Sequence, residues 1–150
     1  MNKARNEHPL VVLDGLIYAI GGGNFCCSES YDPSTDTWSS RAATRYDQES
    51  SSVTLHENKI YILSSDGFEM FYPQSGMWQE FDKPNVHSGS QLVSINGKLL
   101  AIGDEEYEGR HDYKPSKSIF EFDTSNHTWR KVSQMNVPRS EHRAVVVNFE

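Results

Sequence analysis

The sequence predicts an all-β fold built from a repeated four-stranded unit. Three observations lead to this prediction. No stretch keeps the apolar face of a helix over three turns. Tryptophans recur at residues 38, 78 and 129, and short apolar runs flank a tight turn ahead of each of them. A register that recurs in this way indicates copies of one structural unit placed side by side.

The first half of each unit reads as two strands joined by a tight turn. The turns, in chain order, are Asp14-Gly15, Glu57-Asn58 and Asn96-Gly97. Asp-Gly and Asn-Gly favour the type I′ hairpin, because both central residues need positive φ angles. When the first strands are aligned on Leu13, Leu55 and Ile95, the second unit has one extra residue in its turn. The spacing of Val145 and Val147 repeats the end of this first strand in the tail.

The second half of each unit is predicted to form two more strands. Five residues, largely turn formers, join them and directly precede the tryptophan. The expected strands are 10–13, 16–20, 28–32 and 37–41 in the first unit, 51–55, 59–63, 68–72 and 77–81 in the second, and 90–95, 98–102, 118–123 and 128–132 in the third. Residues 143–149 are expected to open a fourth unit.

The first unit also carries a sequence signature. Gly21-Gly22 follows its hairpin, and Tyr31-Asp32 and Trp38 come after it. This pattern resembles the Kelch repeat, and the resemblance covers about residues 5–149. The glycine pair is replaced by Ser64-Ser65 in the second unit and by Gly103-Asp104 in the third, so the chain resembles a divergent member.

The resemblance implies that residues 1–150 form a partial Kelch β-propeller, with three four-stranded blades (about 10–41, 51–81 and 90–132) plus the first strand of a fourth (143–149). A propeller closes with four to eight blades, so three cannot close alone. The chain is therefore either part of a larger ring or half of a six-bladed dimer. The tail strand would duplicate residues 10–13 in such a dimer, which favours a larger chain.

Composition excludes several functions. Lys and Arg number 14 against 21 Asp and Glu, giving a net charge of −7, which disfavours a nucleic-acid or anionic-membrane surface. The longest apolar run, residues 16–20, is far shorter than the roughly 20 residues that span a bilayer. The adjacent Cys26 and Cys27 are expected to be reduced thiols of a cytoplasmic protein. The six histidines have no metal-binding spacing and no nucleophile motif occurs, so no metal, cofactor or catalytic residue is expected.

The candidate binding residues lie just ahead of each first strand. The Kelch resemblance implies that these loops line one rim of the central channel and contact a partner peptide. The candidates are Glu7, His8, Glu49, Ser50, Ser88, Ser90, Glu141 and His142. Glu7, Glu49 and Glu141 fall at the same distance ahead of their first strands. Three like charges at one register would focus a negative potential and favour a basic or hydroxyl-rich peptide. The alternative is that these glutamates pair with Arg5, Arg45 or Arg139 and only order the loops.

The third unit carries an insertion of eleven residues relative to the first tryptophan spacing. It lies between Asp104 and Lys117 and is rich in charge, with Tyr107 and Tyr113. Long loops on a rigid scaffold often bind partners, whereas a charged insert is more often a solvated, mobile loop.

These observations predict a non-catalytic protein-interaction module. The resemblance implies the substrate-recognition domain of a cullin-type E3 ubiquitin ligase adaptor. In such adaptors the cullin binds only through a BTB domain, which these residues do not contain. The alternatives are an enzyme on a Kelch propeller, of the sialic acid mutarotase or carbohydrate oxidase type, and an actin-binding scaffold, because the fold alone does not choose among them.

Overall fold

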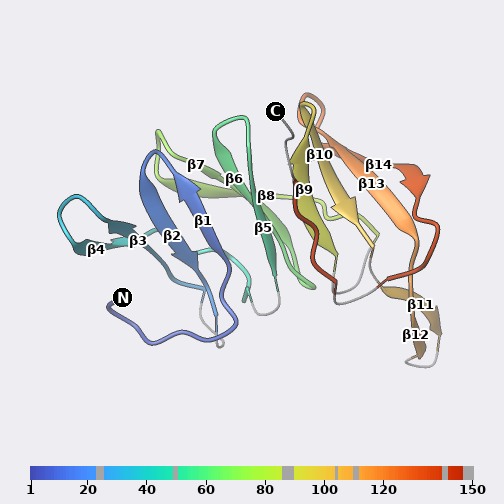
Figure 1. Cartoon of the computed structure of the whole chain (residues 1–150), viewed down its shortest axis with the longest axis horizontal. Coiled ribbons are helices and arrows are strands. Elements are labelled where there is room, and N and C mark those ends of the chain that lie inside the picture. Colours follow the sequence, from blue (N-terminus) through green and yellow to red (C-terminus); the bar gives the residue numbers. More distant parts are fainter. Residues whose placement is uncertain are drawn as a thin grey trace.

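The computed structural model confirms the all-β prediction: three four-stranded antiparallel sheets lie side by side like the blades of a propeller (Figure 1). It describes residues 1–22, 26–48, 51–85, 90–103, 105–109, 112–139 and 142–146. Blade 1 consists of β1 (Leu10–Leu13), β2 (Leu16–Ile20), β3 (Ser28–Asp32) and β4 (Thr37–Arg41). Blade 2 consists of β5 (Ser52–His56), β6 (Lys59–Leu63), β7 (Phe68–Tyr72) and β8 (Met77–Phe81). Blade 3 consists of β9 (Gln91–Ile95), β10 (Lys98–Ile102), β13 (Ser118–Asp123) and β14 (Thr128–Gln134).

Two-residue turns join the first two strands of every blade. Both central residues have positive φ in each turn: 51° and 76° at Asp14-Gly15, 47° and 58° at Glu57-Asn58, and 51° and 70° at Asn96-Gly97. The turn of blade 2 therefore has the same length as the others, and His56, opposite Lys59, takes the place of Leu13. The extra residue expected in this turn was wrong, because Glu57 and Asn58 adopt the left-handed conformation that Asp-Gly and Asn-Gly favour.

In blades 1 and 3, the last residue of the third strand holds the turn that leads to the fourth strand. One carboxylate oxygen of Asp32 accepts hydrogen bonds from the backbone N–H and the hydroxyl of Ser34, at 2.8 and 2.6 Å. Asp123 and Ser125 repeat the arrangement, at 2.9 and 2.6 Å. The serine hydrogen bonds lower the pKa of both carboxyl groups. The turn formers ahead of Trp38 and Trp129 thus act through local hydrogen bonds of their side chains.

The hydrophobic core lies between the blades. One buried cluster joins Leu13, Tyr18 and Ile20 of blade 1 to Ile60, Ile62 and Phe71 of blade 2. A second cluster joins blade 2 to blade 3; its buried members are Tyr61, Leu63, Phe68, Met70, Leu92, Leu99, Ala101 and Phe122. The first strand β5 lies against both β1 and β9. Each blade therefore buries one face against each neighbour, as a radial arrangement requires.

A hydrogen bond from tryptophan accompanies each of these interfaces. The indole N–H of Trp78 donates to the carbonyl of Ala42, at the end of blade 1, over 3.0 Å. The indole of Trp129 donates to the carbonyl of Asp82, at the end of blade 2, over the same distance. The recurring tryptophan of the sequence is thus a contact from one blade to the blade before it.

The insertion of blade 3 forms a two-stranded hairpin, although its charged composition favoured a solvated loop. Strands β11 (Glu105–Gly109) and β12 (Asp112–Pro115) pair with each other, with Tyr107 opposite Tyr113 and Glu106 opposite Lys114.

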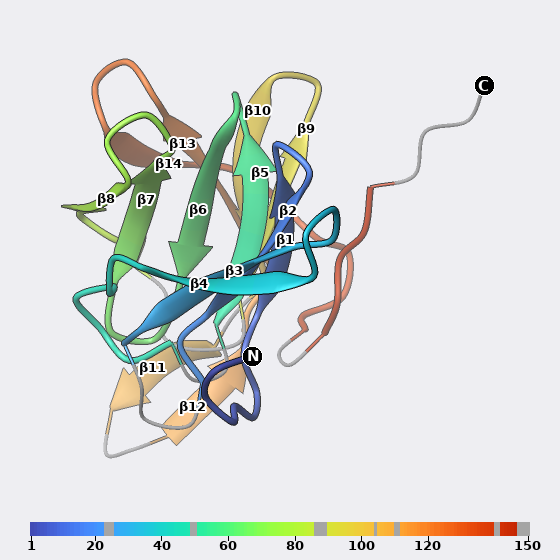
Figure 2. The same cartoon turned by 90° about the vertical axis from the view of Figure 1, so that its left-hand side faces the viewer.

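The predicted strand over 143–149 remains a prediction. Residues 142–146 have no strand structure, and 147–149 lie outside the described part of the chain. Figure 2 shows this segment standing apart from the sheets, on the side of the innermost strands. A strand needs hydrogen-bonded neighbours, and in the described residues no further blade lies beside it to supply them.

Candidate partner-binding rim

The segments that lead into β1, β5 and β9 lie at one edge of the three sheets, here called the rim. Because successive strands run antiparallel, the rim also carries the connection between the second and third strand of each blade. In blade 3 that connection holds the β11–β12 hairpin, which projects from the rim in both Figure 1 and Figure 2. The blade-connecting segments and the insertion are therefore gathered at the same edge of the molecule.

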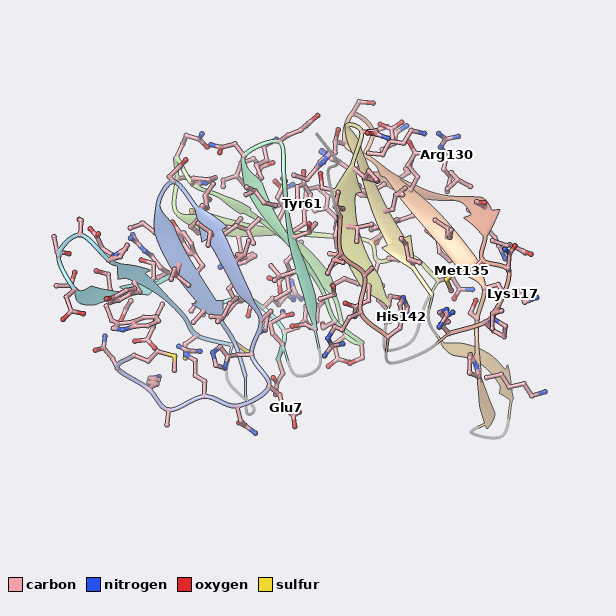
Figure 3. All side chains as sticks on the ribbon, in the orientation of Figure 1. Glu7, Tyr61, Lys117, Arg130, Met135 and His142 are labelled. Carbon is pink, nitrogen blue, oxygen red and sulfur yellow. The ribbon has the colours of Figure 1, made fainter. Side chains whose placement is uncertain are left out.

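The structure describes half of the eight predicted binding residues. Glu7 is exposed, with φ of 52°, and Figure 3 shows it at the rim, away from the sheets. Ser90 is buried, and its hydroxyl donates to the carbonyl of Gly103 over 3.1 Å, so it holds the backbone of blade 3. The others, Glu49, Ser50, Ser88 and Glu141, lie outside the described residues.

His8 and His142 are the other two described candidates, and both are partly buried at the rim. The Nδ1 atom of His8 and both ring nitrogens of His142 are buried without a hydrogen-bond partner in the described structure. Burial, with Arg139 and Arg143 nearby, lowers the pKa of His142. Figure 3 shows His142 at the same edge of the sheets as Glu7.

Glycines allow the rim segments to approach the blades. A Cβ atom at Gly22 would lie 2.6 Å from the Asn6 carbonyl oxygen and 2.7 Å from the Cβ of His8. One at Gly103 would lie 2.3 Å from the ring of His142. Real Cβ atoms do not tolerate such distances, so the glycines after the second strand permit this close approach.

The turn of blade 2 changes which residues share a register. Counted from His56, the positions that correspond to Glu7 and His8 are Ser50 and Ser51, whereas the sequence analysis had counted to Glu49 and Ser50. Glu49 therefore stands one residue away from the register of Glu7. The predicted ring of three glutamates at one register loses this member, although Glu49 still belongs to the rim segment.

A buried ion pair anchors the segment that leads into β1. The guanidinium of Arg5 donates to Oε2 of Glu29 at 3.1 and 3.2 Å, and to the carbonyl oxygens of Gly21 and Cys27 at 2.6 and 2.7 Å. The Arg5 and Glu29 side chains are 0% and 4% exposed. Burial opposes ionisation of Glu29, but the backbone N–H of Asn2 and the Arg5 side chain outweigh it, so the pKa of Glu29 is lowered. Arg5 thus orders its loop, as in the alternative interpretation, but its partner is Glu29, not a rim glutamate.

Blade 2 repeats this anchor with an amide in place of the arginine. Glu69 occupies the position of Glu29, and its Oε2 accepts a hydrogen bond from Nε2 of Gln48 at 2.9 Å. The backbone N–H of Arg45 donates to Oε1 of Glu69 at 2.8 Å, as that of Asn2 donates to Oε1 of Glu29 at 3.0 Å. Burial raises the pKa of Glu69, and the N–H groups of Arg45 and Tyr46 oppose this only in part.

The ion-pair partner of Arg45 is not one of the rim glutamates. Its guanidinium lies 2.9 Å from a carboxylate oxygen of Glu80 on β8, and the Tyr46 hydroxyl donates to the same carboxylate. The rim segment ahead of β5 is therefore fixed to blade 2 at several points. Sequence reasoning missed Glu29 and Glu69, although each stands three residues before the end of its strand in two aligned repeats.

Metal-binding residue types are scattered over the described part of the chain. No group of three or more His, Cys, Asp or Glu among them could hold a metal ion. Both cysteines are free thiols, and Sγ of Cys27 lies 3.3 Å from a guanidinium nitrogen of Arg5. In the part of the chain that the structure describes, no helix is long and apolar enough to cross a membrane.

Comparison with known proteins identifies the family. The model of the Kelch motif matches residues 4–42 and 87–136, so the chain belongs to the Kelch-repeat family. The chain is 32% identical over 124 residues to the F-box/kelch-repeat protein At4g39580 of Arabidopsis thaliana, covering 76% of this chain and 32% of that protein. It is 27% identical over 160 residues to the Kelch repeat and BTB domain-containing protein 12 of Homo sapiens, covering 84% and 26%.

Solved structures agree on the fold. The structure of YjhT superposes with a TM-score of 0.69 at 16% sequence identity, covering 91% of this chain and 54% of that one. At this identity the likeness shows the fold alone. The chain spans about a third or less of the length of the two relatives named above.

Proposed function

We propose that this chain is a non-catalytic interaction module whose rim binds a partner protein. The observation that carries the proposal is the gathering of the blade-leading segments and the β11–β12 hairpin at one edge of rigid, well-packed sheets. Loops held on a rigid scaffold are common binding elements, because the scaffold fixes their positions before the partner arrives.

The proposed partner is a basic or hydroxyl-rich peptide segment. Glu7 is exposed at the rim, Glu49 and Glu141 belong to rim segments, and the insertion contains five acidic residues against three Lys and Arg. A surface with this excess of one sign attracts the opposite charge during encounter. Glu49 lies one residue away from the register of Glu7. The negative charge is therefore spread along the rim and not gathered in one ring.

A finer proposal places the module in a ubiquitin ligase adaptor. Relatives named for an F-box with kelch repeats and for Kelch repeats with a BTB domain support it. In that arrangement the module recognises the substrate, and the cullin binds elsewhere on the longer protein. The enzyme alternative, of the mutarotase or oxidase type, would need catalytic groups that converge at the rim.

Hairpin replacement tests the binding function. In the full-length protein, residues 104–117 are replaced by a short connection, and captured proteins are compared with those of the unaltered protein and probed for cullin. The matched control replaces the exposed turn 73–76 at the opposite edge. We expect the hairpin replacement to lose the substrate but keep the cullin. Retention of every captured substrate would contradict the role of the rim.

A charge test addresses the chemistry of the partner. The changes Glu7→Lys and Glu141→Lys should each weaken binding of a basic peptide about tenfold, because each replaces a negative charge at the rim with a positive one. This loss of affinity should grow as the salt concentration falls, because salt screens the charges. Gln74→Lys adds positive charge at the opposite edge and should leave binding unchanged. Equal affinity in all three proteins would overturn the charge preference.

A further inference from the structure

The interface between blades 2 and 3 has a polar pair of residues where the interface between blades 1 and 2 has an apolar one. By strand register, His56 at the end of β5 takes the place of Leu13. Its neighbour Ser94 on β9 takes the place of Leu55. Nδ1 of His56 lies 2.8 Å from the Ser94 hydroxyl, so a hydrogen bond crosses from blade 2 to blade 3. A side chain that can take up a proton therefore stands where the preceding interface has leucine.

His56 is enclosed by this interface. Its side chain is 3% exposed, and its ring packs edge-on against the ring of Tyr61, with 5.9 Å between the ring centroids. Tyr61 in turn belongs to the buried cluster that joins blade 2 to blade 3. A charged ring in such a place would lose most of its hydration, which costs far more than burying a neutral one. The closed interface therefore accommodates the neutral form of His56.

The charged groups that face His56 do not compensate for its burial. Burial lowers the pKa of His56, against the influence of Glu57 and together with that of Lys59. Oε1 of Glu57, in the turn after β5, lies 4.0 Å from Nε2, but this glutamate side chain is 56% exposed, so water screens its charge. Lys59 lies opposite His56 on β6 and opposes protonation of the ring. From β9 the ring meets the uncharged hydroxyl of Ser94.

A second hydrogen bond crosses the same interface and contains no group that titrates near neutral pH. The backbone N–H of Leu92 on β9 donates to the hydroxyl of Ser52 on β5 over 2.8 Å. Ser52 begins β5 at the rim, and His56 ends the same strand at the opposite edge. The two bonds thus connect β5 to β9 near both ends of β5. Of the groups that form them, the imidazole of His56 is the one whose charge changes close to neutral pH.

We propose that His56 makes the interface between blades 2 and 3 sensitive to protons, so that blades 2 and 3 stay packed at neutral pH and separate more readily in acid. When the interface opens, His56 regains water and binds a proton in the ordinary range of histidine, whereas the closed interface resists protonation. The contribution of His56 to the closed state is therefore full above its ordinary pKa and is lost as pH falls through the pKa of the folded state. Leu13 and Leu55 bind no proton, so acid should act on this interface in preference to that between blades 1 and 2.

Hydrogen exchange of the Leu92 amide tests the proposal, because this N–H forms its hydrogen bond across the interface. NMR of the folded chain at pH 8 and at pH 5, corrected for the intrinsic pH dependence of amide exchange, gives the protection of the amide at each pH. We expect the protection of Leu92 to fall several-fold in acid. In His56→Leu, which gives blade 2 the residue of blade 1, it should stay nearly constant. Comparison with this variant removes the contribution of His142, whose pKa is also lowered by burial.

Ser52→Ala is the matched control, because it removes the other hydrogen bond across the interface. It should lower the urea midpoint by a similar amount at pH 8 and at pH 5. The difference in urea midpoint between His56→Leu and the original chain should instead shift in favour of the variant as pH falls. An equal fall in Leu92 protection in the original chain and in His56→Leu would overturn the proposal, as would a midpoint difference that does not change with pH.

A ring titration of His56 in the unaltered chain does not depend on any variant. Followed by NMR, the imidazole should titrate below the ordinary range of histidine while the chain stays folded. Titration within or above that range would show that the closed interface accepts the charged ring, and it would overturn the proposal even if His56→Leu did not fold.

Discussion

Blades 1 and 2 bury a glutamate at the same place, the second residue of the third strand, but surround it differently. In blade 1 the carboxylate of Glu29 meets the guanidinium of Arg5, which also binds two backbone carbonyls. In blade 2 the carboxylate of Glu69 meets the uncharged amide of Gln48, whose Oε1 is buried without a partner in the described structure. The same backbone position therefore carries a buried carboxylate with a countercharge in blade 1 and one without a countercharge in blade 2.

The difference shows what the anchor does and what it costs. Both carboxylates hold the incoming rim segment through a backbone N–H, so the segment follows the same path in both blades. Only blade 1 neutralises the buried negative charge, and for this reason the pKa of Glu29 is lowered while burial raises that of Glu69. The path of the rim segment is conserved within the molecule even though the charge balance is not.

Removing the arginine should give the largest effect. Arg5→Gln turns the anchor of blade 1 into that of blade 2 but leaves Glu29 buried without a countercharge. Breaking a buried pair in this way costs about 3–5 kcal/mol, which urea unfolding of the chain would measure. A loss below about 1 kcal/mol would mean that Arg5 contributes little more than an amide.

Neutralising each glutamate should separate the two blades. Glu29→Gln removes the charge that Arg5 binds and should lower the free energy of unfolding at pH 7 by about 1–3 kcal/mol. Glu69→Gln removes an unpaired charge, and its amide can still pair with Gln48 if that side chain rotates. Its free energy of unfolding should stay within about 1 kcal/mol of the original or rise. Equal losses in the two variants would contradict the comparison.

The pH dependence of these variants should run in opposite directions. The folded state lowers the pKa of Glu29, so its stabilising contribution is present at neutral pH and is lost as pH falls through the folded pKa. The folded state raises the pKa of Glu69, so its contribution is present at acid pH and is lost as pH rises through the folded pKa. Urea midpoints measured from pH 3 to 7 should show the loss caused by Glu29→Gln shrinking with falling pH. Any gain from Glu69→Gln should shrink over the same range.

Introducing an arginine into blade 2 should give the smallest effect. Gln48→Arg would offer Glu69 the countercharge that Arg5 gives Glu29, and the free energy of unfolding should rise by about 1 kcal/mol. The gain should disappear in the double variant with Glu69→Gln. A gain that persists there would show that the new side chain acts elsewhere, because a pairwise interaction requires both partners.

Much of the fold could be predicted because its signals are local. The Asp-Gly and Asn-Gly turns and the turn formers before each tryptophan locate the strands of blade 1 to the residue. Glu57-Asn58 lacks glycine, so the count in blade 2 slipped by one residue and moved Glu49 into the wrong register. The β11–β12 pairing was missed because its charged composition also suits a solvated loop.

The candidate site could be predicted only in outline. The rim follows from the strand order, but Ser90 proved to be a buried donor to the backbone, and burial depends on packing that no spacing reveals. The Glu29 and Glu69 anchors were missed for the same reason, since a glutamate in a strand usually faces solvent. Their recurrence at one position in two repeats was the signal that could have identified them.

The most direct test of the central claim is a carboxyl-detected NMR titration of Glu29 and Glu69 in the folded chain. The claim is that the same buried position carries a countercharged carboxylate in blade 1 and an uncompensated one in blade 2. Glu29 should titrate below the ordinary range of glutamate, and Glu69 above it. Titration of both groups together, or in the reverse order, would contradict this account of how the rim segments are held.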